Sequence, residues 1–146
     1  MDEKKEYITL SNGKRINKKT WIMATLRRAS YRWPSRNEAL KLARVDRGLY
    51  KCAMCEGTFQ QKETALDHVE PVVPFNGFPM HPNTNEPDWT IVIDRLFCSV
   101  EGFQILCHPC HDVKTMSEDT LRANYSKERK DKEKEEKKLA KRKKKV

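Results

Sequence analysis

The sequence contains too few apolar residues for a large hydrophobic core. Hydrophobic residues make up 37% of the 146 residues, aromatic residues 8%, and the mean hydropathy is −0.88. No apolar run reaches the length of a transmembrane helix, and the opening residues, MDEKKEYITLSNGKR, lack the apolar segment of a secretory signal peptide. These absences exclude a helical membrane protein. They predict a cytoplasmic protein with no membrane partner, whose small core needs a staple such as a metal ion.

Acidic and basic residues are unevenly distributed along the chain. Residues 1–51 carry a net charge of +9, residues 52–126 carry −7, and residues 127–146 carry +7. Basic flanks are typical of proteins that bind polyanions such as DNA, and an acidic centre suits a region that holds cations. The length and this pattern predict one domain with an appended basic arm.

Hydrophobic periodicity and capping residues predict three helices. The first spans residues 18–31. Its apolar face is formed by Trp21, Ile22, Thr25, Leu26 and Ala29. Ser35 and Glu38 form a capping box for a second helix, and Thr115 and Glu118 form one for a third, which continues into the charged tail. We therefore expect helices on both sides of the central region.

The central region is expected to contain short strands and one long loop. Strands are predicted over residues 49–52, 64–68 and 103–106. Residues 71–87 hold five of the seven prolines and predict a loop. These elements and the helices together predict a small α+β fold.

Cysteine spacing is the strongest local signal in the sequence. Two C-x-x-C pairs, CAMC and CHPC, are formed by Cys52, Cys55, Cys107 and Cys110. The two-residue gap lets both thiolates of a pair bind one tetrahedral ion, so the two pairs predict a structural zinc site. Two alternatives stay open, namely two unrelated pairs of buried cysteines, or a zinc shell in which His108 or His111 replaces one cysteine. The fifth cysteine, Cys98, is expected to be a small buried side chain.

An acidic residue and a histidine stand side by side where the second strand ends. If the two cysteine pairs share one ion, the strand that ends at His68 can pack against the helix that carries His111. Asp67 and His111 then suit a divalent cation with open water positions. His68 is the neighbouring group that can take a proton from water.

Three segments resemble the HNH endonuclease family. They are LDHVEP, FQILCHPCHDVKT and KCAMC, and the upstream stretch RWPSRNEALKLARVDRGLYKC is similar to bacteriophage-encoded members with a four-cysteine zinc. The resemblance implies a small ββα-metal finger over residues 62–116, stapled by that zinc. It further implies that His68 activates water, and that Asp67 and His111 bind the catalytic Mg²⁺ or Mn²⁺.

One position departs from the family pattern. The family has an asparagine nine residues before the last histidine, where it holds the loop after the first histidine, and here that position is Gly102. Its role could pass to Glu101, to Gln104 or to the backbone. The departure concerns the geometry of the site more than the class of reaction.

The resemblance also implies an organisation and a set of partners. A basic helical extension spans residues 1–51, the nuclease core residues 52–116, and a charged helix and tail residues 117–146. Double-stranded DNA is the expected partner, together with phage packaging proteins, in the cytoplasm of a bacterial host. The residues expected to contact DNA are Lys114, Arg95, Arg27 and Arg28.

Two other functions compete with the endonuclease. One is a zinc-stapled DNA-binding or packaging accessory protein without catalysis, and the other is a zinc protein that binds RNA through its basic arms. Both need only the cysteines and the arms. The presence of Asp67 and His68 together with His111 favours the enzyme, because a binding protein does not require a second cation site in its acidic centre.

Overall fold

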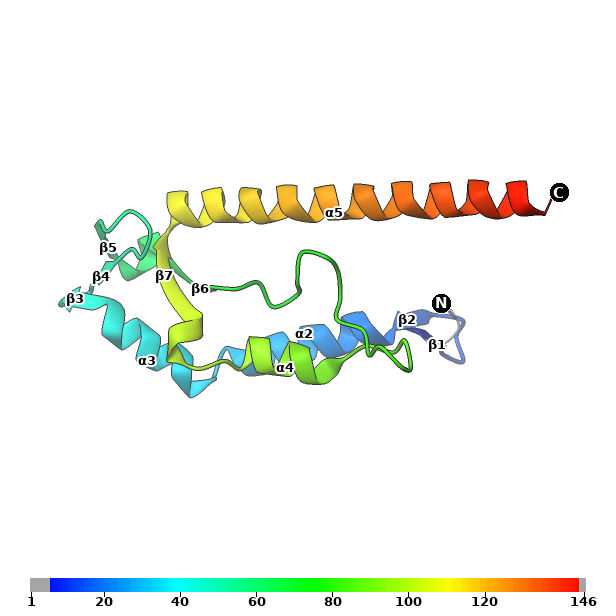
Figure 1. The fold of residues 1–146 in the computed structure, drawn as a ribbon. Coiled ribbons are helices and arrows are strands. Elements are labelled where there is room, and N and C mark those ends of the chain that lie inside the picture. Colours follow the sequence, from blue (N-terminus) through cyan, green and yellow to red (C-terminus); the bar gives the residue numbers. More distant parts are fainter. Residues whose placement is uncertain (1–5, 145–146) are drawn as a thin grey trace.

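The computed structural model describes residues 6–144 (Figure 1). In this range the long helix α5 (His108–Lys143) runs over a layer of shorter helices, and the strands β6 (Thr64–His68) and β7 (Phe103–Cys107) connect the two levels. The fold is therefore mixed, with helices and small antiparallel sheets, as expected. No helix within residues 6–144 is both long and apolar enough to cross a membrane.

The N-terminal part begins with a hairpin that leads into a helix. Strands β1 (Tyr7–Thr9) and β2 (Arg15–Asn17) pair antiparallel. Helix α2 (Lys18–Ser30) follows, and the side chain of Asn17 accepts a hydrogen bond of 2.9 Å from the amide of Thr20 and so caps it. The predicted helix over 18–31 is confirmed, because its cap and its periodic apolar residues agree.

The buried face of α2 matches the predicted one only in part. Trp21 is 59% exposed, whereas Met23 and Leu26 pack against the buried residues Val92 and Leu96. Helix α4 lies beside α2 and packs against the side that carries Met23 and Leu26, of which only Leu26 belongs to the predicted face. The periodicity identified the helix, but the position of its neighbour chose the face.

The next helix begins one residue before its predicted cap. Helix α3 (Pro34–Ala43) has Trp33 at its N-cap position and Pro34 in its first turn, so the predicted capping box of Ser35 and Glu38 is wrong. Proline has the φ angle of a first helical residue and needs no amide partner there, which explains the earlier start.

Three short strands follow α3 and form one antiparallel sheet. They are β3 (Arg44–Asp46), β4 (Leu49–Lys51) and β5 (Thr58–Gln60), in the order β3-β4-β5. Because β4 pairs with β5, this sheet crosses the expected boundary between residues 51 and 52.

A second strand pair leads directly into the long helix. In the register of β6 and β7, Thr64 pairs with Cys107 and His68 with Phe103. The predicted strands over 64–68 and 103–106 are confirmed. Helix α5 starts at His108, with a proline in its first turn, so the predicted capping box of Thr115 and Glu118 is wrong. Helix α5 also crosses the expected boundary between residues 116 and 117.

A long loop and a short helix connect β6 to β7. Residues 71–87 contain no helix or strand beyond one isolated bridge between Met80 and Pro87, which confirms the predicted loop. Helix α4 (Trp89–Leu96) comes next. Two short 3₁₀ turns complete the fold, η1 (Gln61–Glu63) before β6 and η2 (Val100–Gly102) before β7.

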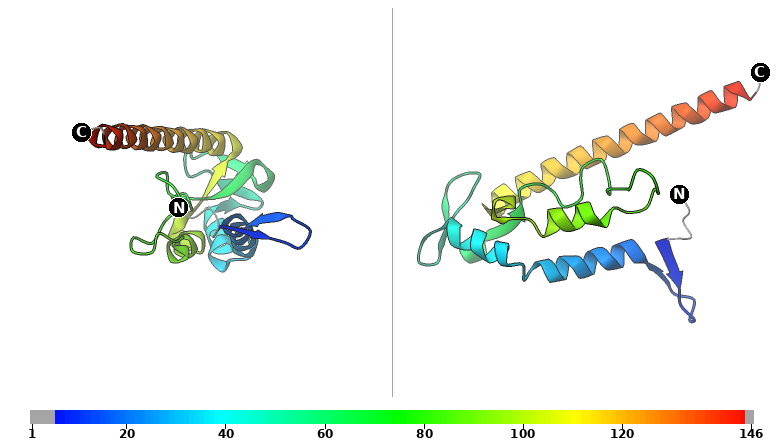
Figure 2. Two further views of the ribbon diagram at one scale, coloured as in Figure 1. Left: turned by 90° about the vertical axis from the view of Figure 1, so that its right-hand side faces the viewer. Right: turned by 60° about the horizontal axis from the view of Figure 1, so that its bottom comes forward.

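Most of the buried hydrophobic residues form two small clusters instead of one large core. One surrounds the cysteines and contains Cys52, Leu106 and Cys107, and the other lies between α2, α4 and the long loop. Beyond residue 130, α5 is exposed on all sides and extends past the rest of the fold (Figure 2). So small a core agrees with the need for a staple.

Candidate functional site

The two cysteine pairs meet at one point. Cys52 and Cys55 lie in the turn between β4 and β5, whereas Cys107 ends β7 and Cys110 lies in the first turn of α5. Their four sulfur atoms are all within 4.8 Å of one another, and 3.9 Å separates the sulfurs of Cys55 and Cys107. Within residues 6–144 this is the only group of three or more cysteine, histidine or acidic side chains gathered so closely.

Backbone hydrogen bonds shape the turn that carries the first pair. The amide of Cys52 donates to the carbonyl of Gly57 over 2.9 Å, and the amide of Glu56 donates to the carbonyl of Cys52 over 3.0 Å. The amide of Ala53 donates to the carbonyl of Ile105 over 2.8 Å, which joins the turn to β7. A Cβ atom at Gly57 would lie 2.8 Å from the ring of Phe59, so this ring would have to shift to admit a larger residue.

The thiols influence one another's ionisation. Burial raises the pKa of Cys52, but nearby backbone amides and the thiol of Cys55 outweigh burial and lower that pKa to about 6. Hydrogen bonding to Cys107, together with burial, raises the pKa of Cys110 to about 12. Four thiols this close ionise together only when a cation balances their charge. The cluster can therefore hold a structural metal such as zinc, for which four thiolates are a common tetrahedral ligand set.

The geometry bears on both alternatives for the cysteines. The pairs lie together and not apart, so they are not two unrelated pairs. His108 is directed elsewhere, because its Nε2 atom donates a hydrogen bond of 2.9 Å to the carbonyl of Lys62. The four-cysteine set is the one that the fold brings together.

Asp67, a predicted ligand of a catalytic metal, contacts a lysine from α5. The Nζ atom of Lys114 lies 2.8 Å from Oδ2 of Asp67 and also binds the carboxylate of Glu118. Burial lowers the pKa of Lys114, but the two carboxylates outweigh burial and raise that pKa above its ordinary value. A cation bound at Oδ2 of Asp67 would have to compete with this ammonium group.

His111 lies one helical turn before Lys114. It is half-buried, and the three-residue separation places both side chains on the same face of α5. The contact between Lys114 and Asp67 shows that this face is directed toward the end of β6. Asp67 and His111 thus come from two elements that pack together, as predicted from the shared cysteine cluster.

The imidazole of His68 is held by a backbone carbonyl. Its Nε2 atom lies 3.0 Å from the carbonyl oxygen of Leu96, and its ring packs at 4.8 Å between centroids against Phe103. Because a carbonyl only accepts hydrogen bonds, Nε2 donates, and Nδ1 carries the lone pair in the neutral ring. Burial lowers the pKa of His68 below its usual value of 6.5. The neutral form, which can accept a proton, is therefore favoured.

The backbone holds the loop after His68 at the position of the unusual glycine. The carbonyl of Gly102 accepts a hydrogen bond of 2.9 Å from the amide of Val69. A Cβ atom on Gly102 would lie 2.5 Å from the sulfur of Cys98, so a larger residue does not fit. Cys98 is partly buried, and its carbonyl accepts a 2.7 Å hydrogen bond from the indole of Trp33.

The residues expected to contact DNA differ in their surroundings. Arg95 donates two hydrogen bonds, of 2.9 and 2.7 Å, to the carbonyl of Pro71 and lies 3.6 Å from Glu70, so it braces the long loop. Arg27 and Arg28 are exposed on α2. Lys114 is occupied by its two carboxylates.

Two contacts of the site were missed by reasoning from the sequence. Glu118 was interpreted as a helix cap, although its four-residue spacing from Lys114 is a recognisable ion-pair signal. The carbonyl of Leu96 beside His68 has no sequence signal, because any residue can supply a carbonyl. Comparisons of the chain with protein-family models, curated proteins and solved structures find no significant match.

Removal of the metal should unfold the region around the cysteines. We expect elemental analysis to find one zinc ion per chain, and a strong chelator to lower the melting temperature sharply, because four unbridged thiols cannot hold the two turns together. Cys52→Ser should have the same effect, whereas Cys98→Ser, outside the cluster, should retain both zinc and the melting temperature. Equal melting of all these samples would contradict the assignment.

A side chain at position 102 should destabilise the fold. Gly102→Ala places a methyl group against Cys98, and overpacking of this kind lowers the free energy of unfolding by about 1–3 kcal/mol. Adding Cys98→Ala to that variant removes the nearest atom and should recover part of the loss. Urea unfolding of the two single variants and the double variant measures the coupling, and strictly additive effects would show that the close contact does not matter.

Proposed function

We propose that this protein is a metal-dependent HNH endonuclease or nickase that hydrolyses phosphodiester bonds of DNA. In this proposal the β6–β7 pair and the start of α5 form the family's ββα-metal finger. The observation that supports it best is the contact between Asp67 at the end of β6 and Lys114 on α5, one turn after His111. That contact supports a shared cation between Asp67 and His111, and His68 is the next residue along β6 after Asp67.

His68 is the proposed general base. Its Nε2 atom donates to the carbonyl of Leu96, so Nδ1 is the atom that takes the proton from the attacking water. The water oxygen forms a bond to phosphorus as the bond to the 3′-oxygen breaks. The carbonyl keeps the imidazole ring in one orientation during this transfer.

Asp67 and His111 are the proposed ligands of the catalytic cation. Mg²⁺ or Mn²⁺, when bound, supplies positive charge that stabilises the phosphate and the leaving oxygen. Because Lys114 contacts Oδ2 of Asp67, a cation held by that atom would displace the ammonium group from Asp67 and leave it paired with Glu118. A carboxylate and an imidazole form a donor set that fits such a cation.

Basic segments outside the site are proposed to bind DNA without sequence preference. The exposed arginines of α2 and the charged end of α5 provide this attraction. A bacterial host cytoplasm and phage packaging partners remain part of the proposal, and they rest on the family resemblance alone.

A non-catalytic zinc-stapled DNA-binding protein is the second candidate. The occupation of Asp67 by Lys114 favours it, because a lysine that neutralises the carboxylate can be a purely structural partner. The two candidates differ in a single observable, which is cleavage in the presence of a divalent cation.

Alanine variants separate the proposed base from the proposed ligands. His68→Ala should keep divalent metal binding and reduce cleavage by roughly 10²–10⁴, the usual contribution of a general base. Asp67→Ala and His111→Ala should weaken metal binding itself, and a higher Mn²⁺ concentration should restore part of their activity. Calorimetric metal titration and plasmid nicking on all three variants test this difference.

The pH dependence provides a control on the same preparations. Cleavage by the parent should rise with pH as His68 loses its proton and should level off above the lowered pKa of this residue. His68→Ala should lack this rise. If the parent does not cleave with Mg²⁺ or Mn²⁺, the non-catalytic candidate is correct. If the parent cleaves and all three alanine variants cleave like it, the roles proposed for His68, Asp67 and His111 are wrong.

Truncation after Lys130 should affect binding more than chemistry. It removes nine basic and four acidic residues from the exposed end of α5. DNA binding should weaken and its dependence on salt concentration should become less steep, because fewer phosphates are neutralised. Cleavage at saturating enzyme and low salt should persist, and its loss would assign a structural or catalytic task to the tail.

A further inference from the structure

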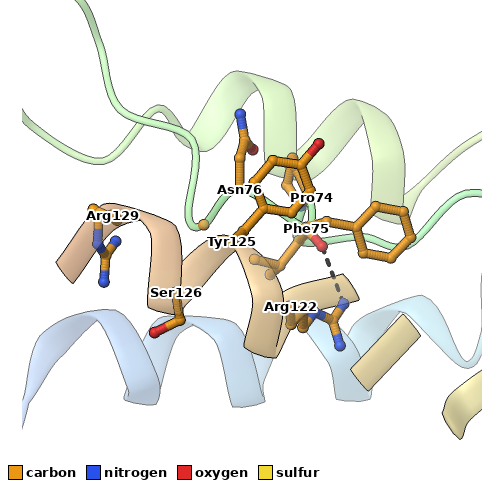
Figure 3. A pocket seen from close by; sticks show the side chains of 9 residues that line it. Pro74, Phe75, Asn76, Arg122, Tyr125, Ser126 and Arg129 are labelled. Carbon is orange, nitrogen blue, oxygen red and sulfur yellow. Dashed lines mark hydrogen bonds between the residues drawn. The ribbon is translucent and has the colours of Figure 1, made fainter. Parts of the chain in front are cut away.

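A cavity separate from the site around Asp67 lies between the long loop and α5 (Figure 3). Its volume is about 170 Å³, and residues 73–77 of the loop form one wall while one face of α5 forms the other. The guanidinium of Arg122 donates a hydrogen bond of 3.1 Å to the carbonyl of Val73 and joins the two walls. The cavity is therefore tied to both elements.

Aromatic and cationic groups line this cavity together. Phe75 and Tyr125 contribute rings, Asn76 an amide, and Arg122 and Arg129 guanidinium groups. Figure 3 shows Arg122 and Arg129 on opposite sides of Tyr125. The side chain of Tyr125 is accessible, since this residue is 47% exposed. Arg122 also lies 6.0 Å from the ring centroid of Phe75 and 3.9 Å from the exposed carboxylate of Asp119.

The cavity lies on the same helix face as the candidate site. Seen along α5, His111, Lys114 and Arg122 fall within about 80° of one another at 100° per residue, and Tyr125 and Arg129 fall in the same sector. His111 and Arg122 are eleven residues apart, which is about 16 Å along a helix. One continuous face of α5 thus connects the two places.

The chemistry of the lining indicates a nucleotide. Aromatic rings stack on nucleic-acid bases of any sequence, and arginines bind the phosphates of the same strand. The volume lies below the roughly 300–1,000 Å³ of pockets for drug-sized ligands, so one planar ring fits better than a cofactor. A paired base in a duplex cannot present its face to a side chain, which selects an unpaired nucleotide.

We infer that this cavity binds one unpaired nucleotide of the DNA substrate, with its base against Tyr125 and its phosphates beside Arg122 and Arg129. The inference rests on the proposed function for the identity of the substrate, and on the cavity itself for the site. The cleaved bond is placed beside His111 in this inference. The distance of about 16 Å from there to Arg122 corresponds to roughly five nucleotides of a strand, at 3.4 Å per nucleotide.

Binding and cross-linking without cleavage test the inference. The probe is a fluorescein-labelled single-stranded DNA that carries 5-iododeoxyuridine, and no divalent cation is added. Ultraviolet cross-links located by mass spectrometry should fall on Tyr125 or Phe75. By fluorescence anisotropy, Tyr125→Ala should weaken binding roughly 5- to 150-fold, the effect of losing one stacked base, and Tyr125→Phe should bind like the parent.

Matched variants control for the general loss of a ring or a charge. Tyr31→Ala removes an exposed tyrosine outside the cavity and should leave the affinity unchanged. Arg129→Ala should lower the salt slope of single-strand binding by about 0.7. Arg47→Ala removes the same charge at the β3–β4 turn, away from the cavity, and should not change this slope. Cross-links elsewhere, tighter binding of an RNA of the same sequence, or equal effects within each matched pair would overturn the inference.

The outcomes distinguish this inference from the proposed function. A cross-link at Tyr125 in a protein that does not cleave DNA with Mg²⁺ or Mn²⁺ would remove the nuclease and keep the nucleotide site. Cleavage by a parent whose Tyr125→Ala and Arg129→Ala variants bind single-stranded DNA normally would keep the nuclease and remove the site.

Discussion

The structure depends on the meeting of four cysteine sulfurs within 4.8 Å. The sequence separates the two pairs widely, and between them lie β5, β6, the long loop and α4. Few apolar residues are available to close so long a segment, and the buried cluster at this point consists largely of the cysteines themselves with Leu106. A metal ion shared by the two pairs would compensate for the small core, because binding energy at such a site contributes directly to folding.

The same meeting point sets the geometry of the candidate site. Cys107 ends β7 and Cys110 lies in the first turn of α5, so the direction of the helix is fixed where the strand stops. The pairing of Thr64 with Cys107 then decides which residue of β6 faces α5. Asp67 consequently meets Lys114, while His68 turns toward the carbonyl of Leu96. Neighbouring residues of a strand point to opposite faces, which explains their different partners.

The long loop is held in place by hydrogen bonds from arginine side chains of other elements. Arg95 holds its start at the carbonyl of Pro71, and Arg122 holds it again at the carbonyl of Val73. Both arginines satisfy backbone groups that no strand or helix satisfies. The loop therefore remains close to α5, and the space between them forms a cavity and not a packed interface. Arginine side chains thus both hold the loop and line the proposed nucleotide site.

Much of the fold and part of the site followed from the sequence alone. Cysteine spacing predicted the cluster, and short apolar runs and prolines predicted β6, β7 and the loop, because these signals depend on local chemistry. The sequence did not predict the exposure of Trp21, the helix caps, the carbonyl of Leu96 beside His68 or the contact of Glu118 with Lys114. A helix shows which residues share a face, but only the position of α4 decides that Met23 is covered and Trp21 is not. Likewise, the close approach of Gly102 to Cys98 exists only in the folded chain, where a backbone carbonyl holds the loop after His68.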